Sequence, residues 1–513
     1  MQFFSNMRLF GPRSVFWSAF GFSALLAILW ALASPIYSVP DENAHVAKAI
    51  SQANGQLVGD TVPGVDYIVV ELPDEYSYSP QSVCFVRNAD ISADCGSEPG
   101  DVGGTDWFNT WVGAYNPIYY YLVGWPSLIF DGSAGIYAMR IVSAVLSAIF
   151  LGWAFQAGLV ERSARWMPLG LAFLVSPMII YFAGSVNPQG LEITSAAALW
   201  LGLLRLLQTW GSPGEVQLKR WYLWLIVTVS AATLANARAT GPLWVVVVVG
   251  LCLLVSGWKP TKALFTTPNS YAWMGGLSVA GMFSVGWTLS SGSLTGQANE
   301  SDAPLVNAGF LHGFWYMIRQ LPAFTQQAVG FFGWLDTPLP AFAYSLFYVA
   351  FAMLTLLALT ATGRREWKVL FAVIAAAALV PAFVQGYSVG QTGIIWQGRY
   401  GLFLYIGIGL VAAWLLSAPA GGRVAFLSVR LTSVLVPILA IYGLAAFVLV
   451  LRRYVVGLDR PITAMLSDPE WQPPLGWIPL TAAFAATIAL FTIWMIRYAV
   501  IAAHTDPLPE ATA

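Results

Sequence analysis

The sequence predicts an all-α polytopic membrane protein with about twelve transmembrane helices. The 513 residues are 58% hydrophobic and only 10% charged. Apolar runs long enough for a bilayer, which takes about 20 residues per helix, recur from one end of the chain to the other, and no soluble domain separates them. The net charge of −1 gives no indication of a nucleic-acid partner. We therefore expect a single integral membrane domain over residues 1–513.

The expected spans are joined by connections of very different length. They cover residues 14–35, 134–158, 166–185, 188–209, 221–236, 241–257, 271–291, 341–361, 367–387, 400–418, 428–451 and 475–498. The first run is too long for a typical signal peptide, so we expect it to be retained. Residues 116–130 are also apolar, but Pro117 and Pro126 interrupt them. We expect an interfacial or re-entrant helix there, and a further span is the alternative.

Basic residues gather on one side of this arrangement. They are Arg8, Arg13, Arg162, Arg165, Lys219, Arg220, Lys259, Lys262, Arg364, Arg365, Lys368, Arg423, Arg430 and Arg497. By the positive-inside rule this side is cytoplasmic, as are both termini. The extracytoplasmic side then receives three loops, at residues 36–115, 293–340 and 452–476, and three short connections near Asn187, Arg238 and Arg399.

Two carboxylates and a histidine follow the first span in the motif Ser38-Val-Pro-Asp-Glu-Asn-Ala-His45. Ser38 resembles a helix N-cap, Asn54-Gly55 resembles a stop, and Asp41 and His45 would share one helical face. Acidic residues in a first turn also stabilise a helix through its dipole, and that interpretation stays open. The functional interpretation makes Asp41 a general base that Glu42 or His45 orients. Asp41 and Glu42 are also candidate ligands of a divalent cation, although one short cluster does not supply a full ligand set.

A second polar group interrupts two apolar runs at Asn187-Pro-Gln-Gly-Leu-Glu192. Buried carboxylates at membrane depth are costly and usually face a cavity or a partner. Asn187 and Glu192 are therefore candidate substrate contacts, with a turn capped by Asn187 as the equally weighted alternative.

Arginines at the extracytoplasmic ends of spans form the third group. Arg238 lies in Asn236-Ala-Arg-Ala-Thr-Gly-Pro242, and Arg399 lies in Trp396-Gln-Gly-Arg-Tyr400. A single arginine at such a position commonly snorkels to lipid headgroups, but two beside glycines and polar side chains on the side of Asp41 suggest a phosphate site. Arg140 is a third, weaker candidate, and Gln397 and Tyr400 are candidate substrate contacts.

Three further features belong to the extracytoplasmic side. Asp336, in Gly333-Trp-Leu-Asp-Thr-Pro-Leu-Pro340, either caps the next helix or contacts substrate. Asn116 opens the tyrosine-rich segment Asn116-Pro-Ile-Tyr-Tyr-Tyr121. Cys84 and Cys95 lie close together in the first loop, and we favour a disulfide over two free thiols. No nucleotide-binding glycine-rich loop and no metal-ligand motif occurs in the sequence.

Together these motifs resemble the GT-C superfamily of integral membrane glycosyltransferases, which place an acidic motif soon after their first helix. More narrowly, Pro40-Asp-Glu-x-x-His45, Asn187-Pro-x-Gly-Leu-Glu192, Gly333-Trp-Leu-Asp336 and Gln397-Gly-Arg-Tyr400 resemble a mostly uncharacterised bacterial family of predicted membrane proteins grouped with them. The resemblance runs from about residue 14 to residue 420. The large soluble C-terminal domain of several GT-C enzymes is missing.

The resemblance implies transfer of a sugar from a polyprenyl-phosphate donor to a cell-envelope glycan or glycoconjugate acceptor outside a bacterial plasma membrane. The expected roles are a general base for Asp41, with inversion at the sugar, and donor phosphate binding for Arg238, Arg399 and Arg140. No cofactor is expected apart from the divalent cation considered above. A glycan polymerase or ligase acting on lipid diphosphates and a flippase for lipid-linked saccharides remain alternatives.

Overall fold

The computed structural model describes residues 11–65, 67–101, 103–160, 164–211, 217–293, 303–418 and 424–505. Three of the predicted cytoplasmic cations, Arg8, Arg162 and Arg423, lie outside the described residues. So does the stretch 294–302 of the predicted second loop.

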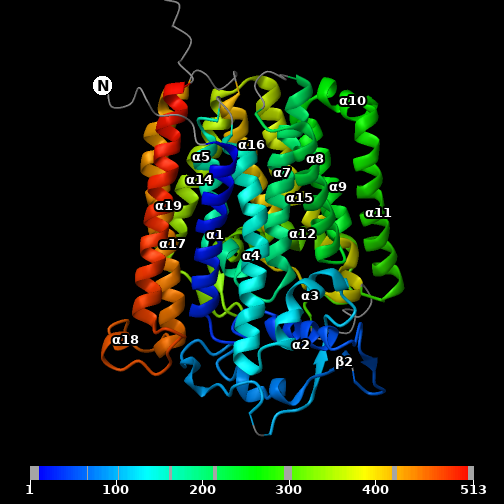
Figure 1. Cartoon of the computed structure of the whole chain (residues 1–513), viewed down its shortest axis with the longest axis vertical. Coiled ribbons are helices and arrows are strands. Elements are labelled where there is room, and N and C mark those ends of the chain that lie inside the picture. Colours follow the sequence, from blue (N-terminus) through cyan, green and yellow to red (C-terminus); the bar gives the residue numbers. More distant parts are fainter. Residues whose placement is uncertain are drawn as a thin grey trace, which may run out of the picture.

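Long helices run side by side and form a single bundle (Figure 1). Among the described residues, eight helices are long and apolar enough to cross a bilayer. They are α1 (Pro12–Ala33), α4 (Gly132–Leu159), α7 (Pro188–Gly211), α14 (Ala341–Ala361), α15 (Arg364–Thr392), α16 (Leu402–Ser417) with the 3-10 turn η7 (Gly398–Gly401) before it, α17 (Ser428–Val456) and α19 (Trp477–Thr505). The protein is therefore mostly helical and polytopic, as the sequence predicted.

The other four predicted spans also correspond to helical segments of the bundle. These are α8 (Arg220–Ala237), α9 (Gly241–Ser256), α11 (Pro268–Ser290) and a broken unit of α5 (Met167–Ala172), η6 (Phe173–Val175) and α6 (Pro177–Ala183). The break lies at Ser176, whose backbone is extended because a residue before proline disfavours the helical region. The span predicted at 166–185 is therefore a broken helix, and the count of twelve spans stays a prediction.

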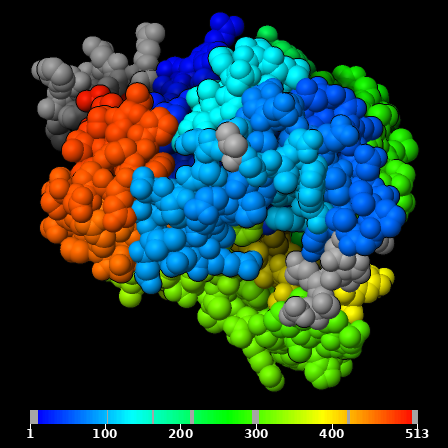
Figure 2. Space-filling model, turned by 90° about the horizontal axis from the view of Figure 1, so that it is seen from below, coloured from blue at the N-terminus to red at the C-terminus, as the bar shows by residue number. Residues whose placement is uncertain are grey.

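One end of the bundle carries a layer of short elements, and a short helix, α10 (Trp258–Thr266), lies at the other end (Figure 1). The layer contains α2 (Glu42–Ala53), α3 (Pro117–Gly124), η5 (Trp125–Leu128) and α18 (Ala464–Ser467). Figure 2 shows this end face on: the first loop, in blue, covers much of the face, and a hollow lies between it and segments coloured yellow. Residues 116–130 thus form α3 and η5, each too short to cross a bilayer.

The first loop also contains a small sheet that the sequence did not predict. Strands β1 (Asp60–Thr61), β2 (Ile68–Glu71) and β3 (Trp107–Thr110) pair antiparallel in that order, with Val69 opposite Asn109. Strands of two to four residues carry too little alternation to be recognised. Short 3-10 turns follow β2: η2 (Asp74–Tyr76), η3 (Pro80–Val83) and η4 (Ala93–Cys95). The predicted disulfide between Cys84 and Cys95 is present, with the two Cα atoms 6.1 Å apart.

The second predicted loop folds back against the bundle. Its helices α12 (Phe310–Arg319) and α13 (Leu321–Gly330) lead into a hairpin of β4 (Phe331–Phe332) and β5 (Thr337–Pro338). α12 packs closely on α15, because Gly313 has no side chain to meet Val389. This packing brings α13 against η7 and so fixes the segment that carries Arg399.

Helix α7 lies at the centre of the bundle. It packs against α4, α8, α9 and α16, and every residue of its apolar, membrane-spanning stretch is buried. Its first turn carries Gln189 and Glu192 at the end of the bundle nearest α2. Polar groups in such a position are held in protein rather than in lipid.

Candidate active site

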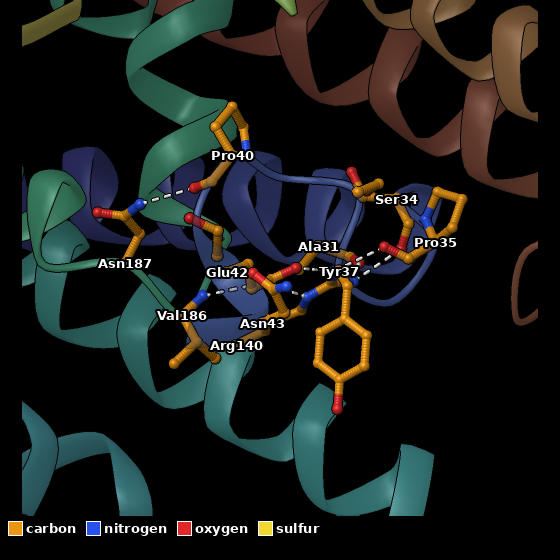
Figure 3. Close-up of polar contacts among 12 residues, drawn as sticks. Ala31, Ser34, Pro35, Tyr37, Pro40, Glu42, Asn43, Arg140, Val186 and Asn187 are labelled. Carbon is orange, nitrogen blue, oxygen red and sulfur yellow. Dashed lines mark hydrogen bonds and ion pairs between the residues drawn. The ribbon is translucent and has the colours of Figure 1, made fainter. Parts of the chain in front are cut away.

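Glu42 and Arg140 form a fully buried ion pair where α1, α2 and α4 meet (Figure 3). Arg140 Nε donates to Glu42 Oε1 at 2.8 Å, and Nη2 donates to Glu42 Oε2 at 2.5 Å. The remaining N–H groups of Arg140 bind three backbone carbonyls at the end of α1 and just after it, those of Ala31, Ser34 and Pro35. Glu42 Oε1 also accepts from the backbone N–H of Val186.

This arrangement corrects two predictions. Arg140 has five N–H donors, and all five bind protein acceptors, so none is left for a donor phosphate. Glu42 is 0% exposed and has both oxygens engaged. Both residues therefore hold the end of α1 against the start of α2, and neither keeps an unpaired side-chain group.

Asp41 is the N-cap of α2, in place of the predicted Ser38. Its backbone is left-handed, with φ 65° and ψ 2°, a region that aspartate and asparagine enter more readily than most residues. The helix then begins at Glu42 and ends at Ala53, beside the predicted stop at Asn54-Gly55. The unusual backbone turns the Asp41 side chain out of the helix, and about a fifth of that side chain is exposed.

Arg399 pairs directly with Asp41, although the two lie far apart in the chain. Nη2 of Arg399 donates to Oδ2 of Asp41 at 2.5 Å and contacts the Tyr400 hydroxyl at 3.3 Å. Burial alone would raise the pKa of Asp41, but the charge of Arg399 outweighs it, helped by His45 and Arg238, and lowers the pKa below its ordinary value. Asp41 is therefore ionised at neutral pH.

The Arg399 guanidinium keeps unused donors inside the protein. Its side chain is only 4% exposed, and neither Nε nor Nη1 has a hydrogen-bond partner. A buried charged donor without an acceptor is costly. The ring of Phe182 lies 5.3 Å from its Cζ atom and offers no acceptor oxygen. Two unpaired donor groups on one buried guanidinium leave room for acceptor oxygens such as those of a phosphate.

Arg238 adds a second guanidinium to the same group. It follows α8 directly, and its Cζ lies 4.5 Å from the centre of the Tyr400 ring, which Arg399 also contacts at 5.1 Å. Its Nη1 lies 4.0 Å from Glu192 Oε2, an oxygen without a hydrogen-bond partner. The structure thus brings the predicted residues Asp41, Arg238 and Arg399 together, with Glu192 and Tyr400 beside them.

His45 lies one turn after Asp41 and is buried. Its Nδ1 is 2.8 Å from the Tyr120 hydroxyl, and its ring stacks on that of Tyr120. Burial lowers the pKa of His45 to about 3, against the opposing effect of Asp41 and with the help of Arg238 and Arg399. His45 is therefore neutral near pH 7. In the next turn, burial lowers the pKa of Lys48 to about 8.

The two predicted asparagines position the backbone around the site. Asn187 donates to the carbonyl of Pro40 at 3.1 Å (Figure 3) and accepts from the N–H of Gln189 at 3.0 Å. Asn116 caps α3 and donates to Asn236 at 2.8 Å, close to Arg238 in sequence. Both side chains are engaged with protein groups, so we assign them to positioning rather than to substrate contact.

Unpaired amide groups mark a residue that sequence reasoning missed. Gln189 is 1% exposed, and neither its oxygen nor its nitrogen has a partner. The oxygen of the predicted residue Gln397 is also unpaired. The signal for Gln189 was present in the sequence, because it lies three residues before Glu192 and so on the same face of α7.

Asp336, predicted as a helix cap or a substrate contact, binds protein groups outside the cluster around Asp41. Its Oδ2 accepts from Arg453 Nη2 at 3.1 Å and from the backbone N–H of Arg87 at 3.0 Å. Arg453 also binds carbonyls of the first loop, including that of Phe85. Asp336 therefore ties the β4–β5 hairpin to α17 and the first loop, and this network explains its place in the motif without a substrate.

The predicted pairing of Asp41 and Glu42 around a cation does not match their side chains. Asp41 binds Arg399, whereas Glu42 binds Arg140. In the part of the chain that the structure describes, no group of three or more His, Cys, Asp or Glu side chains converges as metal ligands would.

Comparisons with known proteins agree with the membrane character of the chain. The model of a family described as predicted membrane protein, DUF2142, matches residues 24–408. No curated protein matches the chain. Among solved structures, ArnT from Cupriavidus metallidurans in the apo state is similar, with a TM-score of 0.43 and 12% identity over 94% of this chain and 76% of that one. The same protein bound to undecaprenyl phosphate gives a TM-score of 0.38 and 12% identity, over 93% and 77% of the two chains. Because both TM-scores are below 0.5, we draw no functional conclusion from this similarity.

Proposed function

The chain belongs to the DUF2142 family of predicted membrane proteins, and we propose that it is a GT-C-type glycosyltransferase. In this proposal it transfers a sugar from a polyprenyl-phosphate donor to a cell-envelope glycan or glycoconjugate. One observation carries the proposal: an ionised carboxylate, Asp41, is paired with a buried arginine, Arg399, that keeps two donors unused. A base and an anion site in direct contact are what such a transfer needs.

The proposed reaction is a direct displacement. Asp41 takes the proton of the acceptor hydroxyl, whose oxygen bonds to the anomeric carbon while the bond from that carbon to the phosphate oxygen breaks. The sugar is inverted, and the polyprenyl phosphate leaves with an additional negative charge. Arg399 and Arg238 would stabilise that charge. The side chains of Gln189, Glu192 and Gln397 have unpaired polar atoms. In this proposal these atoms form hydrogen bonds with the hydroxyl groups of the sugar.

The same geometry links donor binding to the strength of the base. A carboxylate with a lowered pKa is a weak base, so the resting pair of Asp41 and Arg399 is poorly suited to proton transfer. A donor phosphate that accepts a hydrogen bond from the unpaired Nη1 of Arg399 would share the positive charge that now acts on Asp41. The pKa of Asp41 would then rise when the donor is bound.

We place the site on the extracytoplasmic side of a bacterial plasma membrane, with both termini in the cytoplasm. The disulfide in the first loop supports this side, because disulfides persist in oxidising compartments. The described basic residues of the predicted cytoplasmic side, such as Lys262 in α10, belong to the opposite end of the bundle from α2 (Figure 1).

Asp41→Asn tests the base. Asparagine tolerates the left-handed backbone at this position, so the variant removes the charge without straining the turn. We expect transfer to fall by a factor of about 100 or more, the scale of a general base, while undecaprenyl phosphate binds at least as tightly as before. Envelope glycans are compared by mass spectrometry in deletion cells complemented with wild-type protein, Asp41→Asn or the exposed control Asp74→Asn. Restoration of the glycans by Asp41→Asn would refute the proposed base.

Arg399→Gln tests the anion site. We expect it to weaken the binding of undecaprenyl phosphate to the purified protein by about tenfold or more, because a charge-assisted pair is lost. The matched control is Arg319→Gln, an exposed arginine of α12, which should bind as the wild type does. Equal affinities for all three proteins would show that Arg399 does not hold the donor.

A further inference from the structure

A groove of about 590 Å³ lies at the end of the bundle opposite Asp41. It runs between the end of α9, the start of α10 and the start of α15, and α10 marks this end in Figure 1. Neither the proposed reaction nor any residue of the candidate active site uses it.

One side of the groove is apolar. Its apolar lining comes from Leu253 and Leu254, in the last turns of α9, and from Val369 of α15. Trp258 stands at its edge with 76% of its surface exposed. Tryptophan at such a position is typical of the boundary between lipid tails and headgroups. The groove thus offers a surface for a hydrocarbon chain.

The other side is cationic. Arg364, Arg365 and Lys368 line it, and the lining residues, all within the described part of the chain, include no carboxylate. Arg365 is partly committed, since it donates to the carbonyl of Val255 at 2.9 Å and lies 3.7 Å from Glu366. Arg364 and Lys368 are exposed and lie one helical turn apart on α15, on one face.

The backbone around the groove carries both polarities. Helices α10 and α15 begin at it, after Gly257 and Gly363, whereas α9 ends there and offers carbonyls to Arg365. The carboxylate of Glu366, in the first turn of α15, lies beside Gly363. The positive charge available to a ligand therefore comes from Arg364 and Lys368 rather than from helix dipoles.

We propose that this groove binds an anionic phospholipid, with its phosphate between Arg364 and Lys368 and an acyl chain along Leu253, Leu254 and Val369. The charge of the rim matches the phosphate, and the apolar wall matches the chain. Headgroup attraction of this kind is worth a factor of about five for each basic residue at a membrane surface. The site is independent of the proposed sugar transfer.

Native mass spectrometry of the full-length protein in detergent tests the proposal. The probes are 1-palmitoyl-2-oleoyl phosphatidylglycerol and the matching phosphatidylcholine. We expect the wild type to prefer phosphatidylglycerol, and Arg364→Gln/Lys368→Gln to bind it roughly 25-fold more weakly, from the two charges removed. Lys219→Gln/Arg430→Gln removes two exposed cations from the predicted cytoplasmic side, away from the groove, and should bind as the wild type does.

Two more measurements separate the outcomes. Arg364→Lys/Lys368→Arg keeps both charges and should retain binding, which shows that loss in the glutamine variant is not a folding defect. Inorganic phosphate at millimolar concentration should fail to displace the lipid, because it lacks the chain. Equal binding of both lipids, unchanged binding by the glutamine variant, an equal loss in the control variant, or displacement by inorganic phosphate would each overturn the proposal.

Discussion

The surroundings of His45 keep its imidazole ring neutral at the candidate site. The ring lies between Asp41 and Tyr120 with almost no exposure. A carboxylate nearby favours the imidazolium, but burial and two guanidinium groups favour the neutral ring, and these win. Because the ring is neutral, Arg399 is the cation that forms an ion pair with Asp41.

The lowered pKa of His45 predicts how stability depends on pH. The unfolded histidine binds a proton below about pH 6.5, whereas the folded one does so only near pH 3. Stability should therefore fall as the pH drops below 6.5, by about 1.4 kcal/mol per pH unit. His45→Gln should reduce the drop in thermal unfolding midpoint between pH 7 and pH 5. An identical drop in wild type and variant would contradict the assignment.

Asp41 also loses stability in acid, but in a separate and lower pH window. Its pKa is lowered in the fold, so its ion pair stabilises the protein above the unfolded value and is lost only as the pH falls through the lower folded one. The effect of His45 begins at higher pH, and the two can be distinguished in one titration.

At the scale of elements, the Glu42–Arg140 pair decides where α2 lies. It joins the end of α1, the start of α2 and the first half of α4 through five hydrogen bonds from one guanidinium. The left-handed turn at Asp41 directly precedes it. Glu42 thus places the neighbouring Asp41 without taking part in its chemistry.

Glu42→Gln should strongly destabilise the protein. It leaves the charge of Arg140 buried without a counter-charge, a change that costs about 3–5 kcal/mol. We expect a lower thermal unfolding midpoint and a lower yield of purified protein. The exposed Glu71→Gln is the control and should behave as the wild type does. A wild-type midpoint for Glu42→Gln would mean that the ion pair does not hold α2 in place.

For the whole molecule, the two ends of the bundle differ in chemistry. One end carries the loop layer, the disulfide and the acidic motif, and the other carries the basic groove. Crossing a membrane fixes these ends on opposite sides, so a lipid-linked donor at Asp41 and an anionic lipid at Lys368 would belong to different leaflets.

Cysteine labelling should report the orientation. The chain has three cysteines, of which Cys84 and Cys95 are bonded and Cys252 is buried. In intact spheroplasts, a membrane-impermeant maleimide should label Asp74→Cys, in the exposed part of the first loop. It should label Lys262→Cys, on α10, only after permeabilisation. The reverse pattern would place Asp41 in the cytoplasm and rule out the proposed envelope acceptor.

Three predictions made from the sequence alone are confirmed: the polytopic helical fold, the disulfide between Cys84 and Cys95, and the family, which matches residues 24–408. These follow from composition, hydrophobic length and short motifs, which are local properties of the chain. The sequence also identified Asp41, Arg238 and Arg399 as residues of one group.

The ion-pair partners of the buried charges could not be predicted from the sequence and became clear from the packing of the helices. Asp41 and Glu42 are neighbours in sequence, but they form ion pairs with different arginines, Arg399 and Arg140. Asp336 pairs with Arg453, so Arg140 and Asp336 both stabilise the fold. Gln189 became visible only through its unpaired amide. A buried charge is stable only when a partner lies within hydrogen-bond distance, because burial removes its water. Which partner is available depends on where helices that are distant in sequence pack together.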